Sequence, residues 1–333
     1  MDLRLPEGER NMINEFKIAF LFSGQGSQIR CMGQKLFDHH PVFRTSMEHS
    51  HAIVQQQLNR NLIDELYHSG TAVFDDILVT HPAIVAVELA MYELMKELDI
   101  TCDYVLGNSL GEFAAGVVAG IWTADNALEM AIEQAKSISR SNDTGVMLSI
   151  ICAKDKISKA LLDRHGLFLA TDNFDGHFTV SGSSLHLDSF LSGLDQQRIQ
   201  YVQLPVKYPF HSPLIEMGCK TFDYSLAHLG AFPDPGPCFI SGLKGEGLSS
   251  MPQSYFSDIA RGYIDFPKAV NYMEQMDGPF LYIDLGPSGT LATFVKYNLP
   301  LSSASKSIPI MTPYKREVEQ LDKLARILNL IPD

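Results

Sequence analysis

The sequence is poor in the features that mark secreted, metal-binding or membrane-spanning proteins. Its five cysteines form an odd set with neither a CxxC motif nor a Cys/His ligand spacing, which argues against a disulfide framework or a zinc site. We therefore expect reduced thiols and a cytoplasmic location. No apolar run reaches the roughly 18 residues of a membrane span, so we expect none. The N-terminal stretch MDLRLPEGERNM lacks the apolar centre of a secretory signal, and we expect residues 1–14 to be flexible.

Basic residues are also scarce. The 26 lysines and arginines face 39 aspartates and glutamates, giving a formal net charge of −13. This balance argues against nucleic acid or an anionic membrane as the main partner. What remains is an ordinary globular composition, long enough at 333 residues for one large and one smaller domain.

The first part of the chain alternates short apolar runs with longer helical patterns. FKIAFLFSG and YVLG are typical of buried parallel strands, whereas residues 81–99, 110–120 and 123–140 repeat apolar residues at helical spacing. The same alternation returns after residue 237, with strands in CFISG and FLYIDLG and helices over 266–275 and 317–328. This order predicts an α/β domain with a mainly parallel sheet.

The middle of the chain has a different pattern. From about Gly145 to Val206 the apolar spacing gives the order strand, helix, strand, strand, helix, strand. That order is typical of a ferredoxin-like split βαβ unit. We predict that residues 144–206 form a small domain inserted into a large domain made of residues 15–143 and 207–333.

Gly107-Asn108-Ser109-Leu110-Gly111 matches the G-x-S-x-G pattern of a nucleophile elbow. The predicted strand before it and helix after it supply the context that this short pattern requires. At such a turn the serine hydroxyl is held clear of the sheet, and the Leu110 N–H at the helix start can stabilise an oxyanion. We therefore interpret Ser109 as a nucleophile.

A serine nucleophile needs a general base, and the chain has eleven histidines. His39, His40, His49 and His51 lie in polar surroundings typical of a surface. His211 follows the predicted insertion, where the chain re-enters the large domain, and such a junction commonly forms one wall of a cleft. Spacing alone makes His211 one candidate base among several.

Six segments in register carry a resemblance to a known family: FLFSGQGSQIRCMG, THPAI, GNSLGEFAAGVVAGIW, NFDGHFTVSG, YPFHSP and DLGPSGTLA. Together they resemble malonyl-CoA:acyl carrier protein transacylases and the acyltransferase domains of polyketide synthases, over about residues 16–328. The resemblance implies an α/β-hydrolase-like large domain with a ferredoxin-like insertion.

The resemblance also implies roles for individual residues. Ser109 would take an acyl group from a thioester, and His211 would act as general base and then acid. Gln25 and the Leu110 N–H would form the oxyanion hole, and a backbone carbonyl within residues 258–270 would orient His211. Asn173 would line the cleft, although a loop-capping role fits it equally well. Phe210 is expected to narrow the cleft.

Three positions depart from the family pattern. Asn108 replaces the usual histidine of the elbow, and His81 in THPAI replaces the usual glutamine. The third departure is Gln134, 25 residues after Ser109, where malonyl-selecting members carry an arginine that pairs with the free carboxylate.

No neighbouring cation replaces that arginine. At about 100° per residue, Lys136 and Arg140 lie off the face of the helix that carries Gln134. Gln134 instead shares an apolar stripe with four residues expected to point inward: Ala127, Met130, Ala131 and Ile138.

These departures favour neutral acyl groups over malonyl, because a buried carboxylate without its cationic partner costs roughly 3–5 kcal/mol. The chain most resembles the stand-alone acyl hydrolases of polyketide systems, which clear stalled acyl groups from acyl carrier proteins. The alternatives are a malonyl- or other acyl-CoA:acyl carrier protein transacylase and an inactive docking scaffold. No cofactor or metal is implied, since the phosphopantetheine arm belongs to the acyl thioester substrate. The expected partners are acyl carrier protein domains of a polyketide synthase, with no nucleic acid and no membrane.

Overall fold

The computed structural model describes residues 16–330 except 71–73, 142, 237 and 329. The expectation of a flexible segment over residues 1–14 falls outside this range. The larger of two sheets has the strand order β11-β10-β1-β2-β7-β8, with all neighbours parallel except β7 and β8. Its strands are β1 (Lys17–Phe22), β2 (Tyr104–Gly107), β7 (Phe239–Ser241), β8 (Glu246–Gly247), β10 (Phe280–Asp284) and β11 (Lys306–Pro309).

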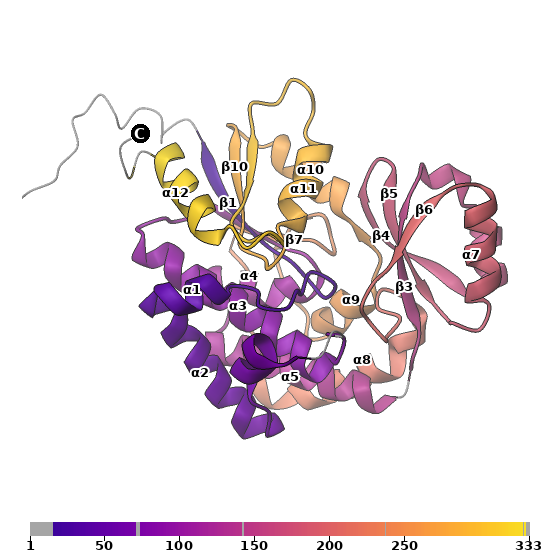
Figure 1. Cartoon of the computed structure of the whole chain (residues 1–333), viewed down its shortest axis with the longest axis horizontal. Coiled ribbons are helices and arrows are strands. Elements are labelled where there is room, and N and C mark those ends of the chain that lie inside the picture. The colour runs from indigo at the N-terminus through magenta and orange to yellow at the C-terminus, as the bar shows by residue number, and fades with distance from the viewer. Residues whose placement is uncertain (1–15, 71–73, 142, 237, 329, 331–333) are drawn as a thin grey trace, which may run out of the picture.

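Helices cover both faces of this sheet, and alternate residues of β1 enter two apolar cores. Phe20 and Phe22 pack among α3 and its neighbours, whereas Ala19 and Leu21 pack against α10 and α11. Figure 1 shows the helices gathered on either side of the strands. They are α1 (Gln34–His39), α2 (Pro41–Leu58), α3 (Ile77–Glu97), α4 (Glu112–Val118), α5 (Ala124–Ser141), α8 (Glu216–Ser225), α9 (Tyr255–Arg261), α10 (Phe266–Glu274), α11 (Thr290–Asn298) and α12 (Glu317–Ile327).

Helix α3 is the one described helix with the length and apolar composition of a membrane span. In this structure 83% of its most apolar window is buried inside the protein. It packs against α2 and α5 in the main apolar core, which accounts for its hydrophobicity. It also begins at Ile77, four residues earlier than the pattern indicated, because Asp76 caps it by accepting a hydrogen bond from the Leu78 N–H at 3.1 Å.

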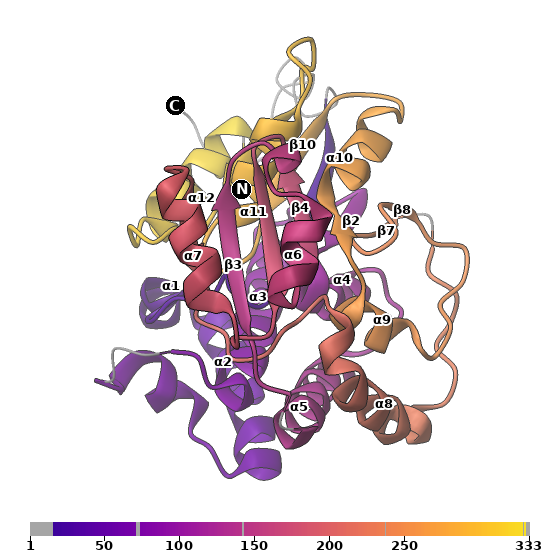
Figure 2. The same cartoon turned by 90° about the vertical axis from the view of Figure 1, so that its right-hand side faces the viewer.

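The second sheet has the order β6-β3-β5-β4-β9. Its first four strands and two helices follow one another as β3 (Val146–Ile151), α6 (Lys159–His165), β4 (Leu167–Phe174), β5 (His177–Gly182), α7 (Leu187–Gln196) and β6 (Gln200–Gln203). This order is the ferredoxin-like arrangement, so the predicted fold class is confirmed: an α/β-hydrolase-like large domain with a ferredoxin-like insertion. Figure 2 shows α6 and α7 on one face of this sheet.

The fifth strand of the small sheet comes from outside the predicted insertion. Strand β9 (Ile264–Asp265) pairs in parallel with β4, with Ile264 opposite Thr171 and Asp265 opposite Asp172. A two-residue strand has too little periodicity to be seen in a sequence. The small sheet is therefore completed by the large-domain segment that lies between α9 and α10.

Candidate active site

Ser109 lies at a tight turn between β2 and α4. Its φ angle is 57°, in the left-handed region that side chains other than glycine rarely adopt. The flanking glycines allow close backbone contact: a Cβ at Gly111 would lie 2.1 Å from the Phe22 carbonyl oxygen, and one at Gly107 would lie 2.4 Å from the Glu112 Cα. The turn therefore has the geometry of a nucleophile elbow.

His211 lies next to Ser109, although the two residues are 102 positions apart in the chain. The Ser109 Oγ lies 3.0 Å from His211 Nε2, and His211 Nδ1 lies 2.9 Å from the Gly262 carbonyl oxygen. A carbonyl only accepts, so Nδ1 carries the proton and Nε2 is left free to accept from the serine hydroxyl. The His211 N–H also donates to the Ala260 carbonyl at 2.7 Å, which holds the backbone at a φ angle of 59°.

Burial keeps His211 uncharged. It lowers the pKa of the imidazole to about 4, although the hydrogen bond to Gly262 acts in the opposite direction. The histidine is thus neutral near pH 7 and able to accept a proton. Among the residues that the structure describes no carboxylate contacts the imidazole, and a backbone carbonyl occupies the orienting position instead.

The loop after β1 lies directly against the elbow. A Cβ at Gly24 would be 2.8 Å from the Ser109 Cβ and 3.2 Å from the Leu110 nitrogen. Within the described part of the chain the Gln25 N–H donates no hydrogen bond, and the Leu110 N–H lies in a first helical turn, where backbone donors lack intrahelical partners. Two backbone donors without partners among the described residues thus lie near Ser109, as an oxyanion hole requires.

The side chain of Gln25 points to other partners. Its Nε2 donates to the Thr80 Oγ1 at 2.9 Å, and its Oε1 accepts from His81 Nδ1 at 3.0 Å. Gln25 therefore offers its backbone, rather than its amide group, to the site.

His81, Gln134 and Phe210 are buried together beside Gln25. The stripe of α5 that carries Gln134 is buried, as predicted, and the rings of His81 and Phe210 have their centroids 5.5 Å apart. Phe210, His81 and Gln134 are all absent from the lining of the cavity at Ser109, so the structure gives no support to the expectation that Phe210 narrows the cleft. Phe210 turns into the apolar core formed with α5.

The pair formed by His81 and Gln134 is neutral. Burial lowers the pKa of His81 to about 3, and an interaction with the Gln134 side chain opposes the shift. The Nε2 atoms of both side chains are buried without a hydrogen-bond partner among the described residues, so the two groups face each other without a well-formed hydrogen bond. No positive charge therefore comes from either side chain.

A cavity of about 240 Å³ opens beside Ser109 and His211 at the junction of the two domains. Asn108 and Asn173 line it, so the structure places Asn173 at the cleft, on β4. Asn173 accepts from the Thr171 hydroxyl at 3.0 Å. The small sheet also contributes Met147, Ser149, His177 and Thr179, and α11 contributes Thr290, Leu291 and Phe294.

Two buried glutamates, which were not singled out from the sequence, bind backbone segments next to the site. Glu112 accepts from the Leu243 N–H at 3.0 Å and contacts the Tyr255 hydroxyl, and burial raises its pKa to about 8. Glu88 accepts from the Ser23 N–H at 2.6 Å, and burial raises its pKa well above the ordinary value. The signal was available, because a lone glutamate within LGEFAAG and another within VAVELAM interrupt otherwise apolar helix faces.

Metal ligands do not gather anywhere in the described ranges: no three His, Cys, Asp or Glu side chains lie close enough to hold an ion. The chemistry available at this site is that of the serine, the histidine and the backbone donors. Together with the α/β-hydrolase-like fold and its insertion, these groups define an acyl-transfer enzyme.

Comparison with known proteins places the chain in a family. Residues 19–328 match the acyl transferase domain, so the chain belongs to the acyl transferase domain family. It is 39% identical over 312 residues to the polyketide biosynthesis acyltransferase homolog PksD of Bacillus subtilis (strain 168), across 92% of this chain and 94% of that protein. It is 36% identical over 311 residues to BaeD of Bacillus velezensis, described in the same words, across 92% and 95%.

Solved structures agree with this fold. The acyltransferase domain from the second module of the salinomycin polyketide synthase aligns with a TM-score of 0.81 at 26% identity, across 93% of this chain and 73% of that one. MCAT from Streptococcus pneumoniae aligns with a TM-score of 0.76 at 21% identity, across 95% and 100%, which shows the fold alone.

Proposed function

We propose that this acyltransferase-family protein removes acyl groups that carry no carboxylate, acetyl and longer, from acyl carrier protein thioesters in polyketide biosynthesis. The observation that carries the proposal is the neutral His81–Gln134 pair, at the position where malonyl-selecting members of the family place an arginine. A malonyl carboxylate that reached this pair would lack a cationic partner. The loss is roughly 3–5 kcal/mol, on the order of 10² to 10³ in selectivity against malonyl.

The first half-reaction follows from the geometry of the site. His211 Nε2 accepts the hydroxyl proton as Ser109 Oγ attacks the thioester carbonyl, and the backbone N–H groups of Gln25 and Leu110 stabilise the oxyanion. The C–S bond then breaks. His211 returns the proton to the departing thiolate, which leaves an acyl ester on Ser109.

Water resolves the ester in the second half-reaction. His211 takes a proton from water, the hydroxide attacks the acyl carbon, and the same oxyanion donors act again. The Ser109–acyl bond breaks, Ser109 recovers its proton from His211, and a carboxylic acid leaves. A transacylase would follow the same steps with a second carrier thiol in place of water.

Transfer is the second candidate, and the acyltransferase names of the relatives favour it. Incubation with acetyl- or malonyl-loaded carrier protein, followed by intact mass measurement, separates the two. We expect rapid loss of acetyl as free acid and little loss of malonyl. Stable transfer of malonyl to a second carrier would overturn the hydrolase proposal, and inertness toward both carriers, identical to that of Ser109→Ala, would indicate a scaffold.

A further inference from the structure

The orientation of His211 depends on a short segment at the end of α9. Ala260 accepts from the His211 N–H at 2.7 Å, and Gly262 accepts from His211 Nδ1 at 2.9 Å. Both contacts are to backbone carbonyls, and the Ala260 side chain is buried in the apolar core that also contains Phe210 and Ile215. What holds this segment against the chain that carries His211 therefore determines where the base lies.

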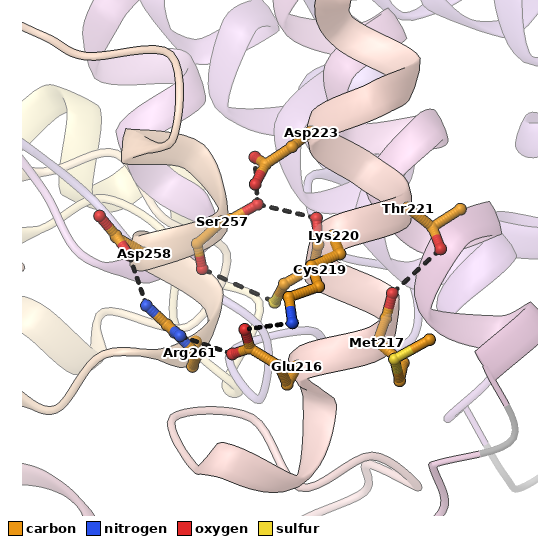
Figure 3. Close-up of polar contacts among 9 residues, drawn as sticks. All are labelled: Glu216, Met217, Cys219, Lys220, Thr221, Asp223, Ser257, Asp258 and Arg261. Atoms are coloured by element: carbon orange, nitrogen blue, oxygen red, sulfur yellow. Dashed lines mark hydrogen bonds and ion pairs between the residues drawn. The ribbon is translucent and has the colours of Figure 1, made fainter.

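Arg261 lies between the two accepting residues. Its Nη1 donates to the Glu216 Oε2 at 2.5 Å and its Nη2 donates to the Asp258 Oδ1 at 2.9 Å (Figure 3). Glu216 is the first residue of α8, five positions after His211, whereas Asp258 belongs to α9 itself. The guanidinium thus connects the end of α9 to the start of α8, and both lie next to the contacts made by His211.

A second connection joins the same two helices one turn away. The Ser257 hydroxyl donates to the Cys219 carbonyl at 2.9 Å and also contacts the Asp223 carboxylate. Figure 3 shows this contact and the Arg261 contacts at separate places along α8 and α9. Ser257 and Cys219 are buried, whereas the Arg261 side chain is 42% exposed. The buried Ser257 contacts hold the two helices together. The contacts of Arg261 hold the last turn of α9.

We propose that Arg261 is a positioning residue for His211: by bridging Glu216 and Asp258 it sets the backbone carbonyls of Ala260 and Gly262 that orient the imidazole. The inference rests on the proposed role of His211 as general base. The planar guanidinium reaches two carboxylates at once, which a single ammonium does less well. An exposed ion pair contributes little to the free energy of unfolding, so the effect belongs to catalysis.

The test compares full-length Arg261→Gln and Arg261→Lys with the wild-type protein. The measured quantity is the rate of acetyl-Ser109 formation from acetyl-loaded carrier protein. We expect Arg261→Gln to lower kcat about tenfold with KM nearly unchanged, because a small displacement of the base costs up to about 10²-fold in rate. Arg261→Lys should recover part of the loss.

Lys220→Gln is the matched control. Lys220 lies on α8 and pairs with the same Glu216 at 3.3 Å, but among the described residues it forms no hydrogen bond or ion pair with α9. Its loss should change the rate less than twofold, within the range expected for an exposed pair. An equal loss in Lys220→Gln, or a wild-type rate in Arg261→Gln, would overturn the proposal.

A serine-reactive fluorophosphonate separates this inference from the proposed function. Its reaction with Ser109 reports activation by His211 without any natural acyl group. If wild-type protein reacts with the probe yet handles no acyl carrier protein, the proposed function fails while the comparison of Arg261 variants still stands. If Arg261→Gln reacts with the probe as fast as wild type, the positioning role is refuted.

Glu216→Gln combined with Arg261→Gln should be no slower than Arg261→Gln alone, because both substitutions break the same contact between Glu216 and Arg261.

Discussion

Ser109 and His211 lie 3.0 Å apart, but the chain holds them in different ways. Ser109 is set by its neighbours in sequence: two glycines that permit the turn and, three residues on, the buried Glu112. His211 is set by carbonyls about 50 residues further along the chain, whose helix is tied by a half-exposed arginine. A local, buried support tolerates changes in salt, whereas a distant and exposed one does not.

The largest expected effect comes from removing the two reacting groups in turn. Ser109→Ala should abolish the covalent acyl-enzyme, and His211→Ala should lower the rate of its formation by about 10² to 10⁴. Intact mass and rapid-quench measurements give both values. If His211→Ala retained the wild-type rate, another group would be the base.

Changing the His81–Gln134 pair, to which we assign the choice of acyl group, should give the next largest effect. His81→Gln together with Gln134→Arg should raise malonyl acylation of Ser109 by up to about 10² relative to acetyl, because a guanidinium then faces the carboxylate. Gln134→Arg alone should gain less, since the buried neutral His81 occupies the adjacent space. Competition between malonyl and acetyl carriers measures the ratio. No gain in the double variant would show that selection lies elsewhere.

The buried support of the elbow is tested by stability. Glu112→Ala should lower the free energy of unfolding by roughly 3 kcal/mol, because the Leu243 N–H and the Tyr255 hydroxyl lose their acceptor and a cavity remains. Glu112→Gln keeps the shape and is the control. Chemical denaturation of the three proteins provides the values, and equal losses in both variants would argue against the cavity and lost acceptor as the cause.

The raised pKa of Glu112 gives that comparison a pH dependence. The folded protein binds the carboxyl proton with a pKa of about 8, above the ordinary value of 4.5. This stabilisation is therefore complete below pH 4.5 and is lost as the pH rises through 8. Wild type should lose stability between about pH 4.5 and pH 8 and level off above that, and Glu112→Gln should lose less over the same interval.

The smallest effect concerns the pH dependence of the reaction. Because the pKa of His211 is about 4, acylation should stay level down to about pH 5 and fall only below that. An ordinary histidine would give a fall near pH 6.5. A rate profile with its midpoint near pH 6.5 would show that burial does not lower the pKa of His211, because water reaches the imidazole.

The sequence was informative where a feature is local. The elbow, the alternation of strands and helices and the inward stripe of α5 depend on short-range spacing, and all three are present in the structure. Five helices (α1, α2, α8, α9 and α11) and the strands β8, β9 and β11 were not identified, and the partner of Gln25 could not be foreseen. Which backbone carbonyl meets His211 also depends on packing between distant segments, and backbone carbonyls carry no sequence signature.

The position of the Phe210 side chain also could not be predicted from the sequence. Its bulk and its place before His211 suggested a cleft residue, but its side chain is buried in an apolar core. The histidine faces the serine, and the phenylalanine enters the core. Even in an extended chain adjacent side chains point to opposite faces, so a place next to His211 does not by itself put a side chain in the cleft.

Strand β9 bears on how this protein could be recombined with its relatives. Exchanging residues 144–206 alone would place a foreign β4 beside the native Ile264–Asp265, two residues from the carbonyl that orients the base. A chimera that exchanges only the continuous insertion would thus disturb the catalytic centre through the pairing of β4 with β9. The exchangeable unit is discontinuous, and a graft that preserves the reaction must carry the segment around residues 260–266 along with the small domain.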